Sequence, residues 1–140
     1  MRLNQLQKLP RQLHVALCVL MFVLISWALL SGNPFAAVRN TPLTHLRTVS
    51  DIILHLGAYT VFATLCFSLI GPHANFRVRR AATVLLVVHA IGTEWLQMWM
   101  PNRTTDPLDA AANLCGIAAG ALLATWVFRF RSSAQTSLSE

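Results

Sequence analysis

Hydrophobic residues along this chain fall into four blocks that are separated by short polar stretches. The blocks run over about residues 13–31, 51–70, 81–100 and 107–128. Each block has about 20 residues, which is the length an α-helix needs to cross a bilayer core of about 30 Å. The pattern therefore predicts an all-α integral membrane protein in which four transmembrane helices form one bundle.

Residues that break or begin helices stand between these blocks. They are Gly32 and Pro34, then Gly71 and Pro72, then Pro101, and finally Pro107. We expect residues 1–12 and 129–140 to be polar tails outside the bundle. The first block follows a basic start, as a signal peptide would, but its apolar run is longer than the usual signal core of about 7–15 residues. This length favours a helix that stays in the membrane.

The composition supports a membrane protein and argues against binding of nucleic acid. Hydrophobic residues make up 55% of the chain and charged residues 11%, whereas an average soluble protein has about 25% charged residues. The net charge of +6 would suit nucleic acid. However, the basic residues stand in short stretches beside the apolar blocks, where they set membrane topology. The expected partner of the apolar blocks is the lipid bilayer.

The basic residues also predict an orientation. If both termini are cytoplasmic, eight basic residues lie inside, namely Arg2, Lys8, Arg11, Arg77, Arg79, Arg80, Arg129 and Arg131. Three lie outside, namely Arg39, Arg47 and Arg103. Because positive residues in short loops favour the cytoplasmic side, we expect a multi-pass protein of the inner membrane with both termini cytoplasmic.

This orientation gathers polar residues at the outer ends of three helices. At a rise of about 1.5 Å per residue, His55 lies about 6 Å inside its block, and Glu94 and Asn113 lie about 9 Å inside theirs. An ionisable residue within an apolar segment is costly and marks a functional site by default. We therefore predict a polar pocket at the outer face, built from Asp51, His55, Glu94, Gln97, Arg103, Asp109 and Asn113.

Residue spacing agrees with these depths. Asp51 and His55 are four residues apart, and Glu94 and Gln97 are three apart, so each pair shares a helix face. Asp109 and Asn113 begin a stripe that continues with two glycines, Gly116 and Gly120. Small residues at this spacing let a neighbouring helix approach closely, so we predict that both glycines serve helix packing.

Each candidate also has a structural interpretation. Asp106 before Pro107 is typical of a helix N-cap followed by proline, and Asp51 and Asp109 suit the first turn of a helix. Glu94 is harder to explain structurally, because a membrane-embedded carboxylate must be paired, here with Arg103, or kept neutral. His89 is interpreted as a residue for packing or helix–helix hydrogen bonding.

Four separated motifs resemble the VanZ-like family of small bacterial membrane proteins. They are DxxxHxxxY (Asp51, His55, Tyr59), ExxQ (Glu94, Gln97), the following Arg103, and DxxxNxxG (Asp109, Asn113, Gly116). The resemblance covers roughly residues 51–125, and the first block matches only as an apolar span. The family is named for resistance to the glycopeptide teicoplanin and has no established molecular activity. The resemblance implies that the motif residues carry the function.

Three classes of function remain open at this point. The first is an envelope protein whose outer pocket binds a lipid-linked cell-wall intermediate or a glycolipid, with Arg103 suited to a phosphate. The second is a membrane enzyme acting on lipid head groups, either with a divalent metal held by Asp51, His55, Glu94 and Asp109 or with a general base. The third is a proton-coupled transporter, although such a site is expected near the membrane midplane. No catalytic residue, cofactor or oligomeric state follows from the sequence.

Overall fold

The computed structural model describes residues 11–101 and 105–136, with side chains up to Arg129. Over these residues the chain forms four α-helices, two short 3₁₀ helices and no strand. In chain order they are α1 (Arg11–Leu30), η1 (Pro34–Ala36), η2 (Pro42–Thr48), α2 (Asp51–Ile70), α3 (Phe76–Gln97) and α4 (Pro107–Thr136). The prediction of an all-α fold is therefore confirmed.

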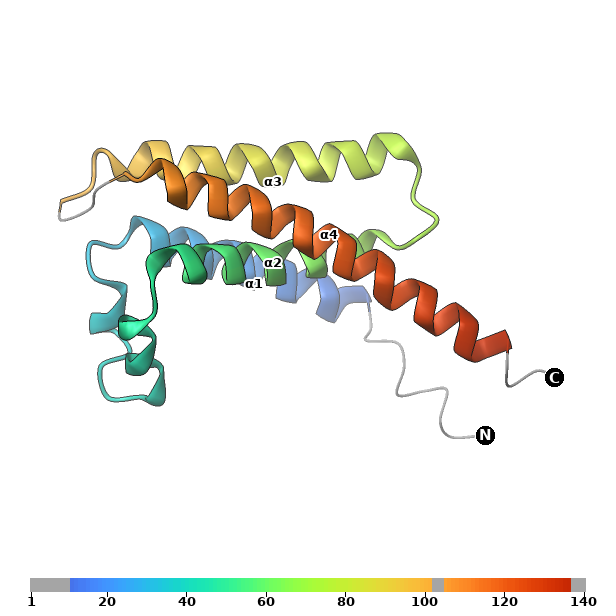
Figure 1. Ribbon diagram of the computed structural model, residues 1–140, viewed down its shortest axis with the longest axis horizontal. Helices are drawn as coiled ribbons and strands as arrows, with labels where there is room; N and C mark the ends of the chain where they lie inside the picture. The colour runs from blue at the N-terminus through green and yellow to red at the C-terminus, as the bar shows by residue number, and fades with distance from the viewer. Residues whose placement is uncertain (1–10, 102–104, 137–140) are drawn as a thin grey trace.

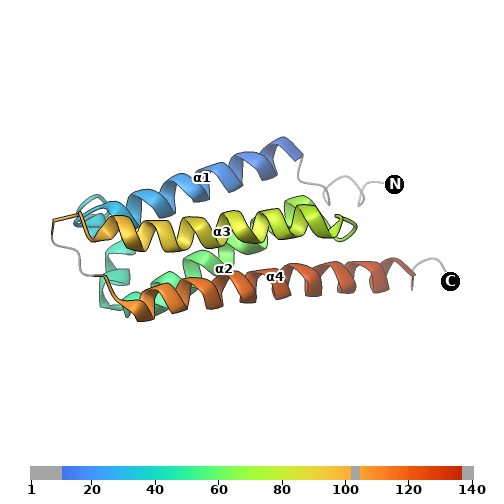
Figure 2. The same cartoon turned by 90° about the horizontal axis from the view of Figure 1, so that it is seen from above.

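The four α-helices lie side by side and run alternately up and down (Figures 1 and 2). The beginning of α1 and the end of α4 lie at one end of the bundle. Residues 31–50, which include η1 and η2, lie at the opposite end, together with the end of α3 and the beginning of α4. We refer to this second end as the 31–50 end.

Two helix boundaries differ by five residues or more from those expected, and the third helix also ends earlier, at Gln97 rather than at about residue 100. The third helix begins at Phe76 rather than at Ala81, because the Asn75 side chain caps it by accepting a hydrogen bond from the Val78 amide at 2.9 Å. The arginines at positions 77, 79 and 80 therefore belong to a helix and not to a loop. The fourth helix continues to Thr136, so much of the expected polar tail after residue 128 is helical. The 3₁₀ helices were not predicted.

Three helices in the described part of the chain are long and apolar enough to cross a membrane. They span Arg11–Leu30, Asp51–Ile70 and Pro107–Arg129. Their outward surfaces are rich in exposed large hydrophobic side chains such as Val19, Leu122 and Trp126. Such a surface is far more apolar than the surface of a soluble monomer, so these helices indicate a membrane protein. Helix α3, the expected third span, is not among them.

Helices α2 and α4 form the most extensive contact of the bundle. Gly116 and Gly120 make this contact possible, because a Cβ atom at Gly116 would lie 2.6 Å from the Leu56 carbonyl oxygen. At Gly120 it would lie 2.5 Å from the carbonyl oxygen of Thr60. The sequence prediction that both glycines serve close helix packing is thus matched by the geometry, and α2 is the helix that approaches them.

Candidate functional site

A cluster of buried polar side chains lies at the 31–50 end of the bundle. It consists of His55 from α2, Glu94 from α3, and Asp109 and Asn113 from α4, with exposed fractions of 5%, 7%, 9% and 0%. We call these four residues the polar cluster. The structure thus brings together four of the seven residues predicted to form the pocket, and it does so from three separate helices.

Asn113 is the central hydrogen-bonding residue of the polar cluster. Its amide nitrogen donates to Glu94 Oε1 at 3.0 Å, and its amide oxygen lies 2.9 Å from Nδ1 of His55. Because the amide oxygen can only accept, Nδ1 of His55 carries the hydrogen of this bond. One asparagine on α4 therefore connects the histidine of α2 to the glutamate of α3.

The imidazole of His55 lies between two carboxylates. Its Nδ1 is 3.4 Å from Glu94 Oε1, and its Nε2 is 3.8 Å from Asp109 Oδ2. When the ring is protonated, it can pair with a carboxylate on either side. The cluster therefore offers a histidine held in place by α3 and α4, with hydrogen-bond donors and acceptors buried among apolar helices.

Gln97 is buried at the same end but has a different partner. Its side-chain nitrogen donates to the Leu29 carbonyl oxygen at 3.0 Å. Leu29 is in the last turn of α1, where carbonyl groups have no partner within the helix. Gln97 therefore fixes the end of α1 against α3, which is a structural role that the sequence did not reveal.

Two other acidic residues of the prediction, Asp51 and Asp106, are not part of the polar cluster. Asp51 is exposed in the first turn of α2. Asp106 caps α4, since its carboxylate accepts a hydrogen bond from the Leu108 amide at 2.8 Å, as its capping interpretation predicted. Arg103 lies outside the described residues, so the expected pairing of Arg103 with Glu94 stays a prediction.

A second polar network lies beside the first and was only partly anticipated. The hydroxyl of Tyr59 is 3.0 Å from Nδ1 of His89 and 3.3 Å from the Thr93 hydroxyl. Nε2 of His89 is in turn 2.9 Å from the hydroxyl of Ser26. The interpretation of His89 as a helix–helix hydrogen-bonding residue is confirmed. Ser26 interrupts the first apolar block and was the available signal for its partner.

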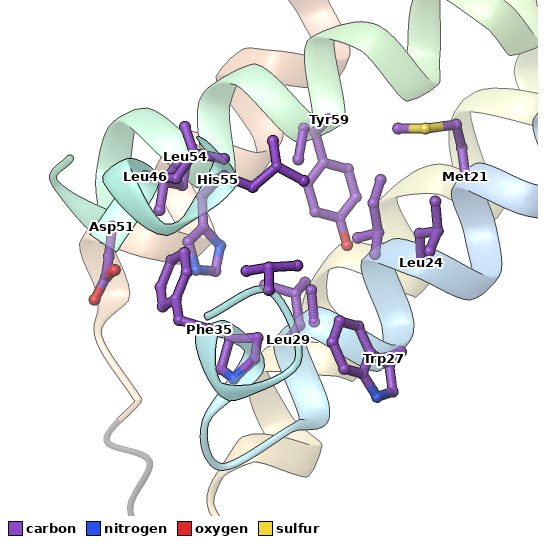
Figure 3. Close-up of a pocket in the computed structure, with 16 residues that line it drawn as sticks. Met21, Leu24, Trp27, Leu29, Phe35, Leu46, Asp51, Leu54, His55 and Tyr59 are labelled. Atoms are coloured by element: carbon purple, nitrogen blue, oxygen red, sulfur yellow. The ribbon is translucent and has the colours of Figure 1, made fainter. Parts of the chain in front are cut away.

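An apolar cavity of about 310 Å³ adjoins the polar cluster between α1, α2 and residues 31–50 (Figure 3). The side chains of His55 and Tyr59 point from α2 toward it, and Asp51 lies at its edge. The remaining lining residues are Met21, Leu24, Ile25, Trp27, Ala28, Leu29, Pro34, Phe35, Val38, Leu43, Leu46, Leu54 and Ala58. His55 is thus the member of the polar cluster that also lines the cavity.

The donor set of the polar cluster suits hydrogen bonding better than metal binding. Among the described side chains there is no group of three or more His, Cys, Asp or Glu residues that could hold a metal ion. Asp51 is exposed, whereas the other three suggested ligands are buried. Nδ1 of His55, which lies 3.4 Å from Glu94, is already engaged in the hydrogen bond with Asn113, and Nε2 faces Asp109.

Comparison with protein-family models, curated proteins and solved structures found no match. The resemblance to VanZ-like proteins therefore rests on the motif residues themselves.

Proposed function

We propose that this chain is a VanZ-like protein of the bacterial inner membrane. It crosses the membrane four times and keeps both termini in the cytoplasm. At the outer face, the polar cluster binds the polar head group of a lipid-linked or glycolipid component of the cell envelope. The family resemblance also makes teicoplanin susceptibility a relevant property of cells that carry the protein.

The proposal of a fourth span is supported by the way polar residues are distributed around α3. With 22 residues, the helix is about 33 Å long at 1.5 Å per residue, enough for a hydrocarbon core of about 30 Å. Its polar residues Thr93, Glu94 and Gln97 are buried, whereas Leu85, Val88 and Ile91 are exposed. The low mean hydropathy of α3 thus comes from inward polar groups and from arginines in its first turns.

The proposed orientation predicts the outcome of reporter fusions. A fusion after Glu140, or within residues 72–75, is expected to be active only with a cytoplasmic reporter. A fusion within residues 101–106 is expected to be active only with an external reporter, because the basic residues are concentrated at the opposite end. A cytoplasmic 101–106 reporter together with an external tail would reverse the orientation. Reporters within residues 72–75 and 101–106 on the same side would exclude a spanning α3, because these two stretches flank that helix.

The observation that carries the binding proposal is the double environment of His55. On one side its ring is held by Asn113 and lies between Glu94 and Asp109. On the other side the residue lines the apolar cavity. A histidine held in this way can offer a fixed polar atom to the head group of a molecule whose apolar part lies in the membrane. Ligand sites of this kind combine apolar walls with a few polar groups.

A thermal-shift screen of the purified protein against lipid-linked cell-wall precursors and glycolipids tests this proposal. A ligand at about a hundred times its Kd adds about 2.7 kcal/mol of stability, so we expect at least one compound to raise the Tm by several degrees. We expect His55→Asn to weaken that binding at least tenfold. His73→Asn, a change at an exposed position in the turn between α2 and α3, is the matched control.

Two outcomes would contradict simple binding. The first is that no compound shifts the Tm, or that the shift is the same in His55→Asn. The second is that mass spectrometry detects a hydrolysed or transferred product of the ligand, which would favour the enzyme hypothesis. The lipid extract of cells with and without the protein provides an unbiased source of candidates.

A further inference from the structure

The walls of the apolar cavity come from α1, from α2 and from residues 31–50 between them. The C-terminal half of α1 and the N-terminal half of α2 form its sides, and residues of η1 and η2 line it at the 31–50 end. The side chains of Leu24 and Leu29 on α1 and of Leu46 on η2 lie around it in Figure 3. A molecule in the cavity would therefore contact apolar side chains along the lengths of α1 and α2.

The polar side chains of the cavity all come from α2 and differ in their availability. The hydroxyl of Tyr59 already bonds to His89 and Thr93, and thus needs no further partner. His55 and Asp51 are about one and two turns nearer to the 31–50 end than Tyr59. A molecule that fits the cavity is consequently apolar along most of its length and polar only near the 31–50 end.

The surroundings of the helices indicate which apolar molecule is available. Water fills a cavity with apolar walls poorly, because it finds few hydrogen-bond partners there. Helices α1 and α2 are both candidate membrane spans, so the medium around them is hydrocarbon. A volume of 310 Å³ lies within the range of about 300–1,000 Å³ that is typical of ligand pockets. The hydrocarbon chain of a lipid meets both conditions.

The charged residues near the cavity indicate which chemical group lies next to that hydrocarbon chain. Residues 31–50 contain the basic residues Arg39 and Arg47, together with His45, against one carboxylate that lines the cavity, Asp51, which directly follows them. All three basic residues are exposed. Each arginine directly follows a lining residue of the cavity, since Val38 precedes Arg39 and Leu46 precedes Arg47. Arginine is well suited to phosphate, to which it can donate two parallel hydrogen bonds.

We propose that the cavity binds the hydrocarbon chain of a lipid whose phosphate lies beside Arg39 and Arg47. This inference rests on the proposed function, because it names the ligand class of the same site. The hydrocarbon chain of the lipid lies between α1 and α2, its phosphate lies at the 31–50 end, and the rest of the head group reaches His55. The ligand class is an anionic lipid with its phosphate directly next to the chain.

Three single-chain probes test the chain and the phosphate separately. Native mass spectrometry of the full-length protein in a neutral detergent would measure the binding of hexadecyl phosphate, hexadecyl glucoside and hexadecyltrimethylammonium. We expect hexadecyl phosphate to bind at least tenfold more tightly than either of the others. Equal binding of the phosphate and the glucoside would overturn the assignment of a phosphate.

Substitutions then locate each part of the probe. Ala58→Phe places a ring in the cavity, and we expect it to weaken the binding of hexadecyl phosphate at least tenfold. Ala118→Phe, on an exposed face of α4, is the matched control. Leu43→Glu adds a carboxylate at an exposed lining residue of η2. It should weaken the phosphate probe even if Ala58→Phe does not fold. Unchanged binding in Leu43→Glu and in a folded Ala58→Phe would overturn the proposal.

The arginine substitutions complete the test and separate it from the proposed function. We expect Arg39→Gln combined with Arg47→Gln to reduce phosphate binding at least tenfold without changing binding of the glucoside. Arg77→Gln, at the opposite end of the bundle, is the control. If no head group binds in the thermal-shift screen but Ala58→Phe still prevents binding of hexadecyl phosphate, the cavity binds a hydrocarbon chain although the proposed head-group site is wrong.

Discussion

Replacement of both Gly116 and Gly120 by alanine is expected to destabilise the protein more than any other change to its packing. A Cβ atom at either position would lie closer than 3 Å to backbone oxygen atoms of α2, and backbone cannot move aside without shifting the whole helix. Overpacking of this kind costs about 1–3 kcal/mol per site. We expect the double variant to lose about twice that, measured as the free energy of unfolding in detergent.

Two other glycines provide matched controls for this prediction. A Cβ atom at Gly57 or Gly92 would have no heavy atom within 4 Å. Since alanine favours a helix over glycine by about 1 kcal/mol, Gly57→Ala and Gly92→Ala should be neutral or slightly stabilising. If the pair at positions 116 and 120 were as tolerant as the pair at 57 and 92, the close contact of α2 and α4 would be wrong.

The polar cluster shows which part of the site can be predicted from the sequence. His55, Glu94 and Asn113 interrupt apolar blocks at similar depths, and a costly polar group in such a place needs a partner. Depth along each helix was therefore sufficient to bring these residues together. A shared helix face was not sufficient to predict burial. Spacing by four places Asp51 on the same face as His55, yet Asp51 is exposed and His55 is buried.

Other features depend on contacts that spacing along one helix cannot reveal. Gln97 shares a face with Glu94, but its partner is a backbone carbonyl of α1, and every residue type has such a group. The cavity likewise requires residues 31–50 to fold over α1 and α2 through η1 and η2. Nothing in the apolar pattern indicates how a short polar segment folds back on the helices.

Asn113→Leu is expected to have the largest effect of any change within the polar cluster. Leucine has a similar size but removes the hydrogen bond from His55 and the one to Glu94. A neutral hydrogen bond contributes about 0.5–1.5 kcal/mol and one to a charged group about 1.5–3 kcal/mol. The free energy of unfolding should therefore fall by about 2–4 kcal/mol in denaturant titrations in detergent. Asn40→Leu, at an exposed position, should have little effect.

A double-mutant cycle with His55→Leu distinguishes lost hydrogen bonds from altered packing. If the two side chains act as a connected pair, removal of Asn113 costs less once His55 is already absent. Contacting residues in one network show coupling energies of about 0.5–3 kcal/mol, and we expect a value in this range. Additive losses would mean that Asn113 stabilises the bundle by packing alone. In that case Asn113 would not orient the His55 ring, and the proposed binding site would lack the fixed histidine on which it depends.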